Sequence, residues 1–149
     1  MYTHILVPSD GSKLSLKAVK TAARLAKSLN AQVTVAHVMP PYMPPVYGDP
    51  IGYAPIVIDP KEYKANAERN ARRVLADAAK AAKAFGVTCG EVMVTDEHPW
   101  QAILKVARNR KCDLIVMSSH GRRGLAGFLL GSETTKVLTH SKLPVLVCR

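Results

Sequence analysis

The chain has 149 residues, 48% hydrophobic and 21% charged, a balance typical of one globular domain with a hydrophobic core. We therefore expect a single domain over residues 1–149. No apolar run approaches the roughly 20 residues that cross a bilayer, and the first residues lack the basic segment and apolar length of a signal peptide. These features exclude a membrane-spanning protein and predict a cytoplasmic location.

The 21 Lys and Arg against 11 Asp and Glu give a formal net charge of +10, which raises the question of an anionic partner. Part of this charge repeats at spacings of four and three residues, as on the solvated face of a helix. Aromatic residues make up only 5% of the chain, so the basic patches with stacking rings that single-strand binders use are missing. Nucleic acid is therefore not the expected partner, and binding to it through the net charge is kept only as a third alternative, with strongly salt-dependent retention on DNA as its expected sign. The basic stripe consists of Lys13, Lys17, Lys20, Arg24 and Lys27.

Three cysteines, Cys89, Cys112 and Cys148, lie far apart in the sequence. An odd number at such distances predicts reduced, buried thiols rather than disulfides. No Cys or His pair has metal-ligand spacing, so we expect no protein-held metal.

The first half of the chain predicts two strands, two helices and a long loop. Residues 4–8 form an apolar run, and Pro, Asp, Gly and Ser then predict a turn and a helix start. The next segment has helical apolar period up to Asn30, and residues 33–38 predict a second strand. Seven prolines between residues 40 and 60 exclude regular structure there, which leaves a lid, a partner surface or a disordered insertion. Residues 61–86 predict a long amphipathic helix.

The second half repeats the alternation of strand and helix. Strands are expected at 87–95, 114–117 and 145–147, and helices after Pro99 and over 132–141. Continuous apolar strands predict a parallel sheet that helices cover on both faces. For five strands we expect an open α/β sheet in the order 3-2-1-4-5, a Rossmann-like arrangement. Ligands bind such sheets beyond the carboxyl ends of the strands, where the order reverses.

Two loops whose residues could bind a ligand leave the strands at this reversal. They are residues 8–12 and residues 118–121. The glycines of the second loop, followed by Gly131-Ser132 at a helix start, indicate an anion-binding site with the Ser132 hydroxyl at the cap position. The alternative is an ordinary strand–turn–helix connection, which uses the same residue types. Asp10 offers a carboxylate acceptor or caps the helix after it. With the backbone of Val38, these groups suit an adenine nucleotide.

The whole chain resembles a single-domain universal stress protein. The resemblance lies in residues 5–12, in His37-Val38, in 117–121, in Gly131-Ser132 and in 144–147. It implies the five-stranded fold and a homodimer formed through the last strand, at Val145, Leu146 and Val147.

ATP-binding members of this family carry Gly, two residues, Gly, nine residues, then Gly with Ser or Thr. Gly121, Gly131 and Ser132 match the later positions, while Ser118 replaces the first glycine. The resemblance implies ATP or another adenine nucleotide, with Mg or Mn held through the phosphates rather than by the protein. The implied nucleotide-binding residues are Pro8, Ser9, Asp10, Val38, Met117, Ser118, His120, Gly121, Arg122, Gly131, Ser132 and Glu133.

We expect an ATP-binding, dimeric stress-response protein that signals to an unknown protein partner. A dimeric interaction protein in which Ser118 closes the site, or a slow ATPase, are the alternatives. Binding is favoured over catalysis because no P-loop is present and Glu133 is also an ordinary first-turn residue. Arg122 and Arg123 add phosphate charge or belong to a solvated turn. A nucleophile–base pair of His120 with Ser118 or Ser119 is not expected, since sequence neighbours seldom face each other.

Overall fold

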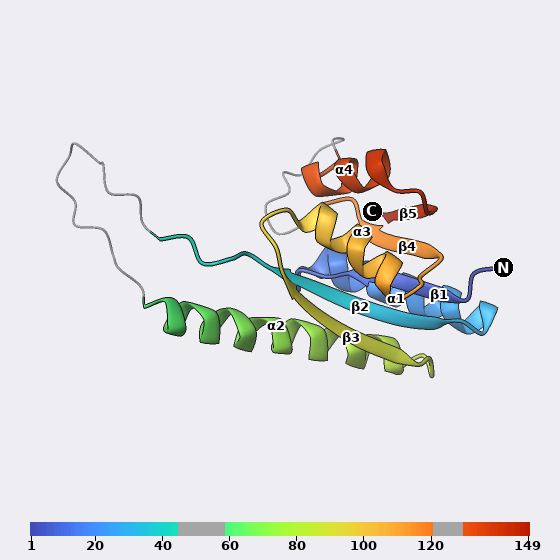
Figure 1. Cartoon of the computed structure of the whole chain (residues 1–149). Helices are drawn as coiled ribbons and strands as arrows, with labels where there is room; N and C mark the ends of the chain where they lie inside the picture. Colours follow the sequence, from blue (N-terminus) through green and yellow to red (C-terminus); the bar gives the residue numbers. More distant parts are fainter. Residues whose placement is uncertain (45–58, 121–129) are drawn as a thin grey trace.

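The computed structural model describes residues 1–44, 59–120 and 130–149 (Figure 1). Strands and helices alternate along the chain, as the sequence predicts. The elements are β1 (His4–Pro8), α1 (Lys13–Leu29), β2 (Gln32–Met39), α2 (Pro60–Lys83), β3 (Cys89–Thr95), α3 (Pro99–Asn109), β4 (Leu114–Ser118), α4 (Ser132–His140) and β5 (Val145–Cys148).

All five strands are parallel and lie in the order β3-β2-β1-β4-β5, which confirms the predicted topology. The order reverses between β1 and β4. The carboxyl ends of these two neighbouring strands therefore lead into separate loops at one edge of the sheet, where such folds hold ligands.

Helices cover both faces of the sheet (Figure 1). Alternate strand residues point to opposite faces, so Ile5 and Val7 pack with α1 and α2 in one apolar core. Leu6 and Ile115 face the other way and pack with α3 and α4. Among the described residues, no helix combines the length and the apolar character needed to cross a membrane.

Two expectations about the elements are wrong. Only the central strands are buried on both faces, because β3 and β5 lie at the edges and are half-exposed. The long helix ends at Lys83 rather than at residue 86, since Gly86 adopts a φ of 77° that turns the chain towards β3.

The start and the end of α1 follow from local chemistry. The Ser12 side chain accepts from the backbone N–H of Ser15 and caps the first turn. Asn30 ends the helix in the left-handed region with a φ of 53°, a conformation that asparagine tolerates better than most residues. The Ser12 cap therefore fixes the start of α1 immediately after the loop that follows β1.

Candidate functional site

The loop after β1 is held by a network of serines. The Ser9 hydroxyl lies 3.0 Å from that of Ser15 and accepts from the backbone N–H of Gly11, whose φ is 80°. Asp10 accepts from the backbone N–H of Ser12 at 2.9 Å. The capping alternative for Asp10 is therefore wrong, because Ser12 is the N-cap and Asp10 forms the turn before it. Pro8 ends β1 and is half-buried.

The end of β2 is tied to this loop. The backbone N–H of Ser9 donates to the carbonyl of Ala36 at 2.8 Å, and His37 Nδ1 lies 2.8 Å from the Ser9 carbonyl. Because a carbonyl only accepts, His37 Nδ1 carries the proton of this bond. The sequence indicated that His37 lies at the end of the strand, but it did not predict the bond to the Ser9 carbonyl.

The backbone of Val38 faces the space beyond β1. The carbonyl of Ala36 points towards β1, since it accepts from Ser9. Backbone groups two residues apart on a strand point to the same side. The N–H and C=O of Val38 are therefore directed past the end of β1, in an orientation that suits a planar ligand with both a donor and an acceptor.

The loop after β4 is fastened to the start of α4. The backbone N–H of Gly131 donates to the Ser119 carbonyl at 2.7 Å, and the Thr134 hydroxyl donates to the Ser118 carbonyl at 3.0 Å. A Cβ on Gly131 would lie 3.2 Å from the Ser119 carbonyl oxygen, so glycine permits this close approach. Met117, immediately before these serines, is buried in the core.

The predicted cap of α4 is wrong by one residue. Gly131 is the N-cap and Ser132 is the first helical residue, and no cap side chain bonds the first turn. The hydroxyl of Ser132 is exposed. The first backbone N–H groups of a helix lack intrahelical partners, so this terminus retains the donors and positive partial charge that suit an anion.

Glu133 points away from an anion at that terminus and towards α3. Its Oε2 accepts from the backbone N–H of Trp100 at 2.9 Å, and its Oε1 lies 3.1 Å from Lys136 Nζ. The N-cap residue of α3, His98, makes no capping bond of its own. The Trp100 ring in turn stacks on His140, with the ring centroids 4.5 Å apart. Both ends of α4 thus contact Trp100.

Two sequence neighbours that were not expected to face each other do so. Ser119 Oγ lies 3.0 Å from His120 Nδ1, while the Ser118 hydroxyl donates to the His120 carbonyl at 2.7 Å. The rule that sequence neighbours seldom face each other therefore does not hold for Ser119 and His120, because the chain turns sharply after β4, while the expectation that they are not a nucleophile and base stays a prediction. Ser119 is only 3% exposed, so these bonds shape the turn.

Several predicted residues lie outside the described ones: Gly121, Arg122 and Arg123 of the glycine-rich loop, and residues 45–58 of the proline-rich segment. Within the described part of the chain, no group of three or more His, Cys, Asp or Glu could hold a metal ion. The cysteines are free. Cys112 is buried, which raises the pKa of its thiol to about 11, whereas Cys89 and Cys148 are only half-buried, contrary to expectation.

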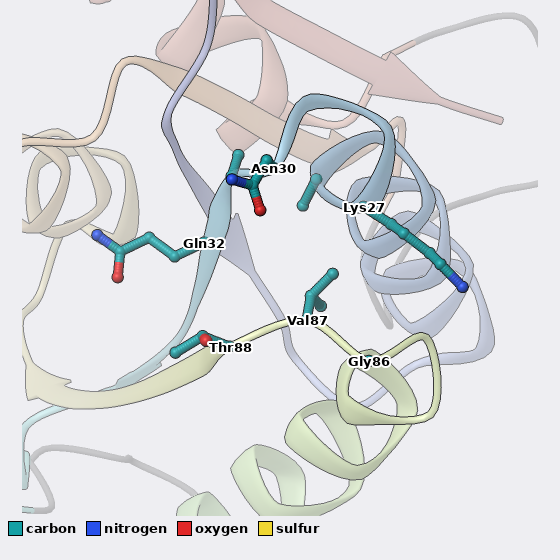
Figure 2. A pocket seen from close by; sticks show the side chains of 8 residues that line it. Lys27, Asn30, Gln32, Gly86, Val87 and Thr88 are labelled. Atoms are coloured by element: carbon teal, nitrogen blue, oxygen red, sulfur yellow. The ribbon is translucent and has the colours of Figure 1, made fainter.

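A cavity of about 240 Å³ lies at the opposite, amino edge of the sheet (Figure 2). It is lined by the end of α1, the start of β2 and the segment 86–88 that leads into β3. Figure 2 shows the Lys27 ammonium and the Gln32 amide extending in different directions rather than converging on a ligand. The carboxyl edge therefore remains the candidate site.

Comparisons with a family model and with individual relatives identify the same family. A sequence model of the universal stress protein family matches residues 1–149. Universal stress protein MJ0531 of Methanocaldococcus jannaschii is 32% identical over 149 residues, covering 100% of this chain and 83% of the relative. Universal stress protein YxiE of Bacillus subtilis is 32% identical over 151 residues, covering 100% of both chains.

Solved structures agree with the sequence relatives. A universal stress protein in complex with cAMP is 30% identical, with a TM-score of 0.72 and coverage of 99% of this chain and 97% of that chain. The structure of protein MJ0577 is 25% identical, with a TM-score of 0.77 and coverage of 99% and 95%.

Proposed function

The chain belongs to the universal stress protein family, and on this premise we propose that it binds an adenine nucleotide, ATP first among them, at the carboxyl edge of the sheet. Occupancy of the site then acts as a signal to a protein partner. A universal stress protein that is 30% identical to this chain has a structure in complex with cAMP, which supports the binding of an adenine nucleotide by this chain.

One observation carries the proposal: three chain segments with ligand-binding groups end at the same edge and are tied in place by short bonds. His37 and Ala36 hold the β1 loop that contains Asp10. Ser119 holds Gly131, and so the start of α4. The arrangement offers a carboxylate, a donor–acceptor backbone pair and a helix terminus without rearrangement of the framework.

The proposed roles follow from these positions. Asp10 accepts from ribose hydroxyls, the Val38 backbone pairs with the base, and the N–H groups after Gly131 receive the phosphates. Glu133 contributes through its backbone, because its carboxylate bonds Trp100 and Lys136. Gly121 and Arg122 are proposed to complete the phosphate site, and a Mg or Mn ion would be held by the phosphates. The proposal is binding without required turnover.

A homodimer through β5 belongs to the same proposal. β5 is an edge strand whose outer side lacks a neighbouring strand in the described sheet, and Leu146 is 40% exposed. Unpaired edges favour strand pairing with another chain. Val145, Leu146 and Val147 would form the contact.

Calorimetric titration with ATP, ADP, AMP and cAMP, with and without Mg, tests the binding. Asp10→Asn keeps an oxygen for the Ser12 bond but removes the charge, and we expect roughly tenfold weaker binding because hydrogen bonds to charged groups contribute about 1.5–3 kcal/mol. Asp96→Asn is the matched control, since Asp96 makes the same kind of turn bond to the N–H of His98 at the end of β3. Absence of heat with every nucleotide, together with no nucleotide in acid extracts of the purified protein, contradicts the proposal.

A further inference from the structure

Most of the net charge lies on two helices. α1 carries five Lys or Arg and no acidic residue, and α2 carries seven Lys or Arg and three acidic residues. Twelve cations against three anions give +9 of the formal +10, so the rest of the chain is close to neutral. We call the solvent side of these two helices the α1–α2 face.

The cationic side chains of the α1–α2 face are exposed. One of its three acidic residues, Glu68, is paired with Arg72 at 3.7 Å, and both groups lie in adjacent turns of α2. Few of the twelve positive charges are therefore neutralised locally. The exposed cations are Lys13, Lys17, Lys20, Arg24, Lys27, Lys61, Lys64, Arg69, Arg72, Arg73, Lys80 and Lys83.

The two helices form one continuous surface on the same side of the sheet. They share a core in which Ala22 and Ala26 of α1 pack with Ala78 and Ala82 of α2. Arg24 of α1 lies 5.6 Å from the centre of the Phe85 ring, just after α2. At 1.5 Å per residue, the helices extend about 25 and 36 Å.

The composition of the face selects among anionic partners. None of the large exposed hydrophobic side chains in the described residues lies on α1 or α2, so the face lacks the apolar centre of a protein interface and the apolar side chains that insert into a membrane. Tyr63, the aromatic residue of α2, is half-buried and packs on Tyr42 rather than standing ready to stack on bases. Recognition by charge alone suits a duplex, which presents one phosphate per about 1.7 Å of axis.

The low aromatic content argues against binding of single strands by base stacking, but it does not bear on phosphate contacts to a duplex. Contrary to the expectation from the sequence, we propose that the α1–α2 face binds duplex nucleic acid through the phosphate backbone, without reading its sequence. The inference is independent of the nucleotide site at the carboxyl edge. Lysine and arginine on rigid helices release condensed counterions when they contact phosphates, and this release drives the binding.

Fluorescence anisotropy with a labelled DNA duplex of about 20 base pairs tests the proposal between 50 and 200 mM KCl. We expect a plot of the logarithm of the association constant against the logarithm of the salt concentration to have a slope steeper than about −3. Such a slope corresponds to more than three neutralised phosphates. Two duplexes of unrelated sequence should bind alike, and a single strand of the same length should bind more weakly.

Two variants with the same net charge separate the face from bulk charge. Lys13→Gln, Lys20→Gln and Lys80→Gln together remove three cations of the face and should weaken duplex binding at least tenfold at 100 mM salt. Lys105→Gln, Arg108→Gln and Lys142→Gln remove three exposed cations elsewhere and should change affinity less than about twofold. Equal losses in both variants, no duplex binding by the unmodified chain, or binding to anionic phosphatidylglycerol vesicles in its place would overturn the proposal.

Discussion

At the scale of single residues, Glu133 shows how a side chain at a predicted ligand site serves the framework instead. It lies in the first turn of α4, yet its carboxylate accepts from the backbone N–H of Trp100 at the start of α3. It therefore replaces the missing cap of His98 and connects two helix starts. A carboxylate turned aside in this way also leaves the first N–H groups of α4 unobstructed.

We expect Glu133→Ala to lower the free energy of unfolding by about 1 kcal/mol, because it leaves the Trp100 N–H without its acceptor. Glu133→Gln retains an acceptor oxygen and should lose less than half as much. Chemical denaturation followed by Trp fluorescence measures both, since Trp100 is the one tryptophan. Equal losses in the two variants would contradict the capping role.

Ser118 stands where the family motif has glycine, and its hydroxyl donates to the His120 carbonyl while its side chain is buried. If its Cβ restricts the phosphate approach, Ser118→Gly should raise ATP affinity severalfold and Ser118→Ala should not. Both variants lose the His120 bond, so both should be less stable by about 1 kcal/mol. Titration calorimetry checks the affinities, and an equal gain in Ser118→Ala would assign the effect to the hydroxyl.

At the scale of elements, the side chains of Asp113 and His4 connect the strands at the amino edge of the sheet. Asp113, just before β4, accepts from the backbone N–H groups of Thr3 and His4 and from the Thr3 hydroxyl. His4 Nε2 lies 2.7 Å from the Thr34 hydroxyl on β2. These bonds connect the starts of β1, β2 and β4, the three central strands.

This edge predicts two steps in the pH dependence of stability. Burial lowers the pKa of His4 below its usual 6.5. Burial opposes ionisation of Asp113, but the hydrogen bonds from Thr3 and His4, together with one from its own backbone, hold its pKa below 3.8. For both groups the pKa is lower in the folded chain, so the unfolded chain binds more protons at a pH between the two pKa values. The contribution to the free energy of unfolding is therefore fully present above the unfolded pKa and is lost as the pH drops through the folded pKa.

We therefore expect the free energy of unfolding to fall below about pH 6.5 and again below about pH 3.8. His4→Gln should remove the upper step, and Asp113→Asn the lower one. Urea denaturation over this pH range compares each variant with the unmodified chain. A stability difference for Asp113→Asn that persists unchanged at the acid limit would contradict the assignment.

At the scale of the whole molecule, the sheet has two edge strands, β3 and β5, and the proposed dimer uses only β5. Under the proposed dimer, Leu146→Lys on β5 should shift the chain to a monomer, because a charge at the centre of a strand pairing is costly to bury. Thr95→Lys on β3, the other edge strand, is the control and should leave the assembly unchanged. Analytical ultracentrifugation measures the mass, and a dimer that persists in Leu146→Lys would exclude β5 as its interface.

The molecule has three separate candidate surfaces. The carboxyl edge is formed by the ends of β1, β2 and β4 with the start of α4, the exposed strand edge by β5, and the cationic face by α1 and α2. Because the three surfaces lie on different elements, each can be changed by its own set of variants. Nucleotide affinity, mass and duplex affinity are therefore independent measurements on the same protein.

The parallel five-stranded fold, the strand order and the ends of most elements were predictable from the amino-acid pattern, because apolar periodicity and residues such as Asn30 and Pro99 act over a few positions. Two features became visible only in the folded chain: Gly131 rather than Ser132 caps α4, with its N–H bonded to the Ser119 carbonyl, and Glu133 bonds Trp100, 33 residues away. The tertiary structure also joined the basic stripe of α1 to the cations of α2. These outcomes depend on close approach between segments distant in the chain, and local sequence pattern carries no information about such distances.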